Sequence, residues 1–374
     1  MSGASTVWHL GVKELRSLLH DKVLFALVIY SFTLGIYAAA DHIPDTLNRA
    51  PIAIVDEDRS QLSSRIASAL YPPYFTPPAD ITAAEMDQRL DDGDVTFALV
   101  LPVDLQRDVL RGERPAIQLN VDATRISQAF TGSGYVEEIV AAEVAEFARH
   151  YREVPELPVA LTSRARFNPL LEFAWFGAVM EIVNNVTMLS IILTGAALIR
   201  EREHGTVEHL LVMPVTPLQI MLSKVWAMGL VVLLACSVSI GVIVRMLIGM
   251  PIQGSMGLFL FGAGVHLFAT TSLGIFLATL ARSMPQFGLL VILVILPLEM
   301  LSGGQTPREN MPEVIQAVMM LAPTTHFVSL AQAILFRGAG PGVVWPQVLA
   351  LLAIGGVLFA LALARFRSTV GAVG

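Results

Sequence analysis

Long apolar runs constrain this chain more than any other feature of its sequence. A helix that crosses a membrane needs about 17 to 25 consecutive, mainly apolar residues. With 54% hydrophobic and only 15% charged side chains, the chain is also too apolar for an ordinary soluble protein. We therefore expect a mainly α-helical, polytopic membrane protein with six transmembrane helices, at residues 23–40, 176–199, 225–248, 258–281, 288–301 and 345–364. The fifth run contains Pro297, so we expect its helix to break or to stop partway.

Basic residues beside these runs predict which ends face the cytoplasm, because Lys and Arg concentrate in short cytoplasmic loops. Nine of them share one side if both termini and the loop after the second run are cytoplasmic: Lys13, Arg16, Lys22, Arg200, Arg202, Lys224, Arg282, Arg365 and Arg367. We therefore predict that the N and C termini are cytoplasmic.

Residues 1–22 are expected to form an amphipathic helix in the cytoplasmic interface of the membrane. One face of this helix would carry an apolar stripe at helical spacing, and the opposite face would carry basic side chains. The stripe consists of Trp8, Val12, Leu15 and Leu19. The alternative is a soluble cap that packs on protein. Ala38-Ala39-Ala40 after the first run also resembles a signal-peptide cleavage site, but the length of the run favours a membrane span.

Residues 41–172 differ in composition from the rest of the chain. They hold 22 acidic residues and 12 arginines, a net charge of about −10. Strand and helix patterns alternate along them, with strands expected near 51–56, 95–101 and 116–121, and helices near 61–70, 83–90, 103–110 and 127–151. We expect a periplasmic α/β domain between the first two spans. Its acidic runs at 56–58 and 91–94 lack the spacing of a calcium-binding loop and favour solvated turns.

A charged island, residues 200–224, separates the second and third spans. Charges alternate in sign from Arg200 to Glu203, and Gly205 and Thr206 interrupt the helix. A short helix then fits before Pro214. The sequence Thr216-Pro217-Leu218-Gln219 has the pattern of a capping box and predicts a new helix start. By pattern alone the island is either a polar turn or a functional connector.

Polar side chains also occur inside the predicted spans, where they are costly. One face of the second span, in the outer half of the bilayer, carries Glu181, Asn184, Asn185 and Met188 at helical spacing. Glu299 lies near the outer end of the fifth span. These residues either line a translocation path or, for the asparagines, hydrogen-bond between helices.

The loop after the fifth span also carries helix signals. Thr306-Pro307-Arg308-Glu309 has the pattern of a capping box, and two apolar stripes follow, near 311–318 and 327–334. We expect two short amphipathic helices at the outer surface, within about 306–336.

Familiar catalytic motifs are missing from the sequence. It contains no phosphate-binding GxxxxGK[ST] loop, no HExxH zinc pair and no GxSxG nucleophile turn. We therefore expect no catalytic residue, no metal site and no bound cofactor in this chain, and no nucleic-acid partner.

The island and its flanks, ALIREREHGTVEHLLVMPVTPLQIMLSKVW, closely resemble the cytoplasmic connector of ABC-2 type permeases, the membrane subunits of ATP-driven exporters. The resemblance covers essentially the whole chain, including GVKELRSLL, PIAIVDEDRSQLS, VDATRISQAFTGSGY, ARSMPQFGLLVILVILPLEMLSGG and PTTHFVSLAQAILFRGAG. The chain is similar to the branch of bacterial inner-membrane multidrug-efflux permeases. This implies export of a hydrophobic or amphipathic substrate, drug-like or lipid-like.

The resemblance also implies partners in the lipid bilayer. Two permease subunits pair, and the connector docks on a separate ATP-binding subunit that uses ATP and Mg. A periplasmic adaptor and an outer-membrane channel can join such a complex, and the helices at 306–336 are re-entrant. Transferred to this sequence, the docking residues are Glu201, Glu203, His204, Gly205, Thr206, Glu208, Leu211 and Pro214.

Two other functional classes fit parts of the sequence. A membrane-anchored sensor would bind a ligand with the acidic domain, but six spans exceed what an anchor needs. An ion-driven secondary transporter would need no ATP-binding partner, but the two halves lack the matching interrupted spans of many such carriers.

Overall fold

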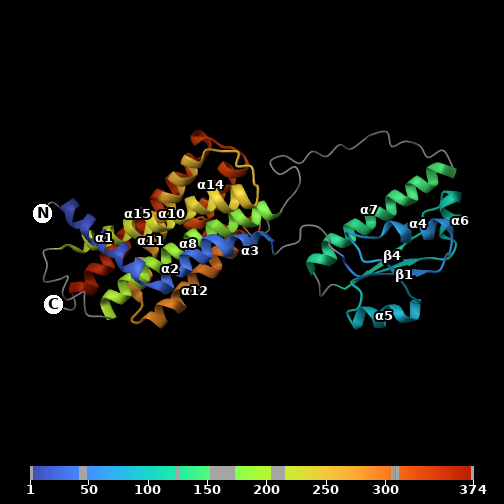
Figure 1. Ribbon diagram of the computed structural model, residues 1–374, viewed down its shortest axis with the longest axis horizontal. Helices are drawn as coiled ribbons and strands as arrows, with labels where there is room; N and C mark the ends of the chain where they lie inside the picture. Colours follow the sequence, from blue (N-terminus) through green and yellow to red (C-terminus); the bar gives the residue numbers. More distant parts are fainter. Residues whose placement is uncertain are drawn as a thin grey trace. The chain divides into compact units, whose positions relative to one another are not determined.

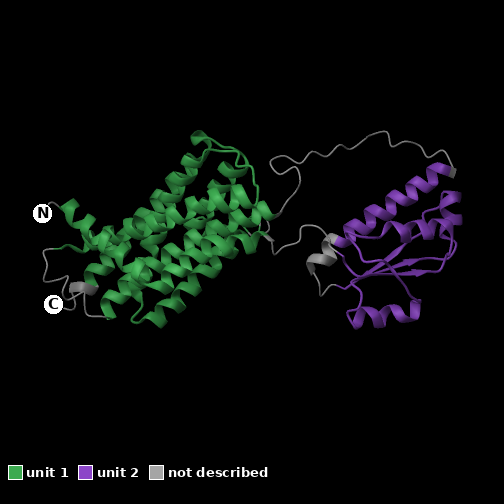
Figure 2. Ribbon diagram, viewed as in Figure 1, with its two compact units in different colours: residues 1–43, 165–374 green, residues 44–164 purple. Residues whose placement is uncertain are grey.

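A computed structural model describes residues 3–41, 49–122, 126–151, 173–203, 215–304, 306, 308 and 311–371. The chain divides into two compact units, one formed by residues 1–43 and 165–374 and the other by residues 44–164 (Figure 2). Each unit has its own hydrophobic core. The second unit is therefore an insertion between two helices of the first.

The first unit is entirely helical in its described residues (Figure 1). In chain order its elements are α1 (Gly3–His20), α2 (Lys22–Tyr30), η1 (Ser31–Gly35), α3 (Ile36–Asp41), α8 (Phe173–Glu203), α10 (Pro217–Ser239), η2 (Ile240–Leu247), α11 (Met256–Leu280), α12 (Met284–Met300), α13 (Glu313–Met319), α14 (Pro323–Ala331), η4 (Gln332–Phe336) and α15 (Pro341–Gly371). The η elements are π-helical turns that continue α2, α10 and α14.

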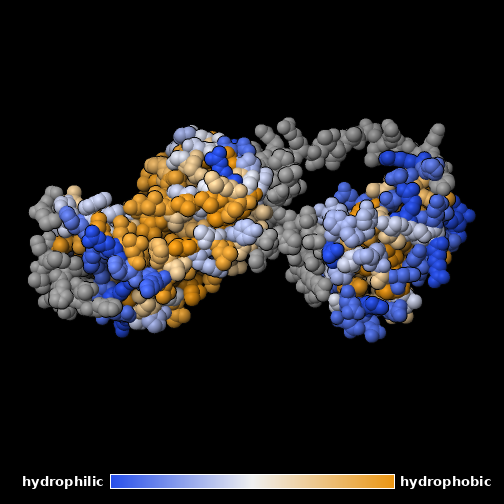
Figure 3. All heavy atoms as spheres, in the orientation of Figure 1, coloured by the Kyte–Doolittle hydropathy of each residue, from blue (hydrophilic) through white to orange (hydrophobic). Residues whose placement is uncertain are grey.

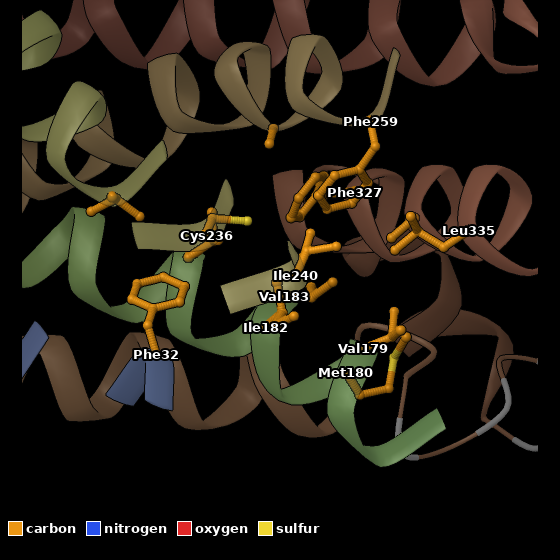
Figure 4. Close-up of a cluster of buried hydrophobic side chains, with 14 of the residues drawn as sticks. Phe32, Val179, Met180, Ile182, Val183, Cys236, Ile240, Phe259, Phe327 and Leu335 are labelled. Atoms are coloured by element: carbon orange, nitrogen blue, oxygen red, sulfur yellow. The ribbon is translucent and has the colours of Figure 1, made fainter. Parts of the chain in front are cut away.

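Helix α8 is the central helix of this unit. In its most apolar 18-residue stretch 83% of residues are buried, against 17% in α15. Its side chains pack with those of α10, α11 and α14 in the main core, where Val183, Cys236 and Phe327 come together (Figure 4). Close approach depends on glycine: a Cβ on Gly274 of α11 would lie 2.6 Å from the carbonyl oxygen of Ile191 on α8.

Five helical stretches are long and apolar enough to cross a membrane: Lys22–Ala40, Ala174–Glu203, Pro217–Leu247, Met256–Leu280 and Pro341–Ser368. They overlap five of the six predicted spans. In Figure 3 hydrophobic residues cover a broad band of the visible face of this unit, whereas the visible face of the other unit is mainly hydrophilic.

The fifth apolar run forms a short helix that is not broken at Pro297 but ends soon after it. Helix α12 has 17 residues, begins at Met284 and continues through Pro297 to Met300. Pro297 lies in the last turn, where the amide of Leu301 still donates to its carbonyl oxygen at 3.0 Å. A proline removes only its own donor, and near a helix end this loss interrupts few other bonds.

Two short apolar helices follow α12. Helix α13 and the continuous pair α14 and η4 meet at an angle of 87°, the geometry of a broken span or a re-entrant loop. Helix α13 begins at Glu313, after Pro312, whereas the sequence predicted a capping box at Thr306. Proline is well suited to a helix start, since it has no amide that needs an intrahelical partner. Part of the predicted capping box, Pro307 and Glu309, lies outside the described residues.

The second unit is a four-stranded sheet with helices on both faces (Figure 1). Its elements are β1 (Ile52–Asp56), α4 (Gln61–Ala69), β2 (Ala79–Asp80), α5 (Ala83–Asp91), β3 (Phe97–Leu101), α6 (Leu105–Arg111), β4 (Gln118–Val121) and α7 (Ile126–Tyr151). The strand order is β2-β1-β3-β4, with only β3 and β4 antiparallel. The predicted strands and helices are confirmed, while β2 was not predicted.

Alternating residues of β1 pack against the helices on the two faces of the sheet. Ile52 and Ile54 pack toward α4 and α7, whereas Ala53 and Val55 pack toward α5. The acidic run after β1 forms a turn: the Asp56 carboxylate accepts hydrogen bonds from the amides of Asp58 and Arg59 at 3.1 and 2.8 Å. These acidic residues therefore stabilise the sheet-to-helix connection.

Candidate functional site

The four charged residues that end α8 contact different parts of the helical unit. Successive helix residues are about 100° apart, so four of them cover a full turn. Arg200 and Glu201 point to the N-terminal helices and α10, and Arg202 and Glu203 point to the turn between α11 and α12. We call residues 200–203 the α8 charged end.

Arg200 and Glu201 join α8 to three other elements. Arg200 Nη1 donates to Asp21 Oδ2 at 2.7 Å, and Asp21 is the N-cap of α2. Glu201 lies between two lysines, with its carboxylate 3.0 Å from Lys13 Nζ of α1 and 2.7 Å from Lys224 Nζ of α10. The N-terminal helices are thereby held on the bundle by ion pairs.

Lys224 is the centre of this ion cluster. Its side chain is only 1% exposed, and its ammonium lies 2.9 Å from Glu14 Oε1 of α1 as well as beside Glu201. Burial raises the pKa of the Glu14 carboxyl above its ordinary value, and the attraction of Lys224 offsets this only in part. The buried Lys224 ammonium thus balances two carboxylates, and the more exposed Lys13 adds a second positive charge at Glu201.

Helix α1 presents Gly11, Glu14 and Leu18 to the bundle as its buried residues. At Gly11 the helix approaches so closely that a Cβ would lie 2.1 Å from Trp226 Cζ2. The Trp226 ring also stacks on Trp8, with centroids 5.0 Å apart. The predicted apolar stripe lies beside this buried face, and two of its members, Trp8 and Leu19, remain about 60% exposed.

Arg202 and Glu203 close the turn between α11 and α12. Arg202 Nη2 donates to the carbonyl oxygen of Ala281, the C-cap of α11, at 2.7 Å. Glu203 Oε1 accepts from the amide of Met284, the first residue of α12, at 2.9 Å. A cation at a helix C-terminus and an anion at a helix N-terminus are each favourable for the helix dipole.

The predicted docking residues fall into two groups. Glu201 and Glu203 have the internal contacts just described. The other six, His204, Gly205, Thr206, Glu208, Leu211 and Pro214, lie outside the described residues. The capping box that follows them is confirmed: Gln219 Oε1 accepts from the Thr216 amide at 2.9 Å, and Thr216 Oγ1 accepts from the Gln219 amide at 3.4 Å.

The structure separates the predicted polar face of α8 into two parts. Asn185 is buried, and its Nδ2 donates to the Ser31 carbonyl of η1 at 2.9 Å and to Glu181 Oε1 at 3.1 Å. Glu181, Asn184 and Met188 are half-buried and follow one line along the helix. Asn185 therefore joins helices, as the second interpretation of the asparagines required.

Glu299 extends this half-buried line onto a second helix. It lies in α12, which packs against α8, and its side chain is also half-buried. The side chain of Asn184 makes no hydrogen bond with any other described residue. We call Glu181, Asn184, Met188 and Glu299 the open polar stripe, since these side chains are accessible on an otherwise buried helix.

Sequence reasoning missed the ion cluster. Lys13 and Glu14 are distant in sequence from Glu201 and Lys224, and only the fold brings these residues together. One signal was present: Glu14 stands between Gly11 and Leu18 at helical spacing, on the face that the helix buries. A charged residue on such a face calls for a partner of opposite charge.

Comparisons with known proteins identify the family. The model of a family described as ABC-2 family transporter protein matches residues 23–364. The chain belongs to the ABC-2 transporter family. The inner membrane transport permease YhhJ of Escherichia coli strain K12 is 60% identical over 98% of both chains. The probable multidrug ABC transporter permease YbhR of the same strain is 27% identical over 97% of this chain and 99% of its own.

Family and structure agree on the class of protein. An ABC-2 permease works within an ABC transporter, whose ATP-binding subunits are its partners, and the apolar helices make this chain a multi-pass membrane protein. The α8 charged end lies directly before residues 204–214, which the sequence resemblance identifies as the connector. The site of interest in this ABC-2 permease is therefore the end of the bundle where α1, α8, α10, α11 and α12 meet.

Proposed function

We propose that this chain is the membrane subunit of an ATP-driven exporter in a bacterial inner membrane, and that it moves a hydrophobic or amphipathic substrate outward. The names of its relatives support this: one is an inner membrane transport permease, and another is a probable multidrug ABC transporter permease. A drug-like or lipid-like substrate fits a carrier whose helices face the bilayer. In this proposal both termini are cytoplasmic and the α/β unit is periplasmic.

ATP and Mg are used by a separate subunit, which docks on residues 204–214. The α8 charged end carries this proposal, because its four side chains connect the start of the connector to α1, α2, α10, α11 and α12. When ATP closes the partner subunits, the connector moves α8 together with these neighbours.

The substrate path in this proposal follows the open polar stripe. A second permease subunit, identical or related, faces the stripe, so that a change in their separation opens and closes the path. A periplasmic adaptor and an outer-membrane channel would receive the substrate beyond the α/β unit.

The experiment separates docking from transmission. The permease is co-reconstituted with its ATP-binding subunit in proteoliposomes, and three quantities are measured: subunit association, ATPase stimulation and export of a lipophilic fluorescent dye. Leu211→Ala should weaken association. Arg202→Gln should leave association intact but reduce stimulation and export, because it removes the bond to the Ala281 carbonyl.

Arg282→Gln is the matched control for Arg202→Gln. Arg282 is exposed in the same turn, and its side chain makes no hydrogen bond or ion pair with the described residues. If Arg202→Gln supported as much ATPase stimulation and dye export as Arg282→Gln, the hypothesis that the α8 charged end transmits the motion would be wrong. If dye export persisted in vesicles without any ATP-binding subunit, the ABC assignment of the activity itself would be wrong.

A further inference from the structure

A polar cavity lies at the end of the helical unit opposite the α8 charged end. Its volume is about 580 Å³. It is enclosed by the first turns of α8, the loop after α12, and one side of α14 and η4. The polar groups that line it come from Ser302, Arg308, Thr325, Ser329, Gln332 and Arg337.

Two buried polar atoms at this cavity have no partner. Thr325 is 2% exposed, and its Oγ1 makes no hydrogen bond with any described residue. The Nε atom of the half-buried Arg308 is itself buried and also makes no hydrogen bond with any described residue. Buried polar atoms are nearly always bonded, and leaving one unsatisfied destabilises the folded state. A bound ligand with acceptor oxygens would satisfy both atoms.

The charge of the cavity is positive. Arg308 and Arg337 both line it, and neither takes part in an ion pair with the described residues. Thr325 stands in the first turn of α14, a nine-residue helix whose N-cap, Ala322, provides no side-chain acceptor. Arginine side chains favour an anion, and guanidinium groups bind phosphate oxygens in pairs.

Gly303, in the turn after α12, lies close to one of these arginines. Gly303 has a φ of +92°, and a Cβ there would lie 3.0 Å from Arg308 Cγ. The volume exceeds what a bare anion needs and is within the range of small-molecule sites. Phe176 and Val328 supply an apolar wall. The ligand therefore carries an anionic group together with a larger body.

We infer that this cavity binds a phosphate group, with Arg308, Arg337 and Thr325 as its main contacts. The phosphate belongs either to a phospholipid headgroup or to a soluble phosphate. This inference goes beyond the proposed export function, and the test below uses the full-length permease without its ATP-binding partner. Failure of one proposal therefore does not imply failure of the other.

The test measures binding of two probes to detergent-solubilised, full-length protein by isothermal titration calorimetry. The probes are short-chain phosphatidylglycerol and inorganic phosphate. Arg308→Gln combined with Arg337→Gln should weaken binding at least tenfold, since each charge-assisted bond contributes about tenfold or more. Thr325→Val keeps the side-chain shape and should weaken binding about fivefold.

Two controls match these variants. Thr324→Val removes a neighbouring buried hydroxyl that also lacks a partner but does not line the cavity. Arg245→Gln removes an exposed arginine of η2. Both should bind as the unchanged protein does, and thermal unfolding verifies that every variant is folded.

Two results would support the inference and identify the source. Binding of phosphatidylglycerol that inorganic phosphate displaces only weakly assigns the site to a lipid headgroup. Tight binding of inorganic phosphate with no gain from the lipid assigns it to a soluble phosphate. If neither probe bound, the inference would be overturned. It would also be overturned if the variants at Arg308, Arg337 and Thr325 bound the probes as tightly as the control variants do.

Discussion

The Nζ atom of Lys224 lies 2.7 Å from Glu201 Oε2, and through this contact α10 and α8 share one buried charge pair. The same ammonium lies 2.9 Å from Glu14 of α1. A buried pair is a weak source of stability, but the loss of one partner leaves an unbalanced charge out of water. The contact therefore fixes which helices belong together more than it adds to the free energy of folding.

Replacing this lysine tests that role. Lys224→Met should lower the free energy of unfolding by about 3 to 5 kcal/mol, because Glu14 and Glu201 would lose their shared cation. Thermal unfolding of the detergent-solubilised protein measures the effect. Lys22→Met, at an exposed lysine, is the control. Adding Glu14→Gln to Lys224→Met should recover part of the loss, and no recovery would contradict the shared-cation account.

Gly11 should tolerate no side chain. Gly11→Ala would place a Cβ 2.1 Å from the Trp226 ring and should separate α1 from α10, although alanine favours helix by about 1 kcal/mol. We expect a lower melting temperature and altered tryptophan fluorescence, because the Trp8–Trp226 stack would open. Gly356→Ala has open space around it and should be neutral or slightly stabilising. Equal behaviour of the two variants would exclude the close contact.

The two adjacent asparagines of α8 should behave differently. Asn185→Leu loses the bond to the Ser31 carbonyl and should destabilise the protein by about 1 to 3 kcal/mol. Asn184→Leu should change stability by less than about 0.5 kcal/mol. If the open polar stripe lines the path, Asn184→Leu should still reduce dye export in the reconstituted complex. Unchanged export would remove Asn184 from the path.

The N-terminus of α5 should respond to acid. The Glu85 carboxylate accepts from the Thr82 amide and hydroxyl at 3.0 and 2.9 Å, and these bonds hold its pKa below the ordinary value. A depressed carboxyl pKa gives stability that is present above the ordinary pKa of 4.5 and is lost as pH falls through the lower, folded-state value.

Hydrogen exchange of the first turn of α5 measures this loss in the full-length protein. After correction for intrinsic rates, protection should fall below pH 4.5 in the unchanged protein. Glu85→Gln has no carboxylate to titrate, so its protection should not depend on pH in this range. The same acid response in both proteins would show that another group is responsible.

Local rules predicted much of the fold. Thr216 and Gln219 formed the expected reciprocal cap, and Ile52 to Asp56 formed the expected buried strand, because each depends on neighbours within a few residues. The apolar runs identified the long helices for the same reason. Pro297 left open whether the helix would break or stop, because the cost of a proline depends on where the helix ends, which the sequence did not reveal.

Long-range contacts were beyond these rules. The sequence predicted Glu201 as a docking residue, but its contacts with Lys13 and Lys224 require three helices to be placed in space. Similarly, Asn184 and Asn185 looked equivalent in spacing, and only the position of η1 distinguishes them. The cavity around Arg308 and Arg337 is lined by residues of α8, of the turn after α12 and of α14, which no local pattern places together.

The α8 charged end limits how the helix can move. Four side chains spread over one full turn are each held by a different neighbour, so any rotation of α8 about its own axis would break several bonds at once. At this end α8 and its neighbours must therefore shift as one rigid group. Relative motion is left to the rest of the bundle, where π-helical turns interrupt the regular bonding of three other helical segments.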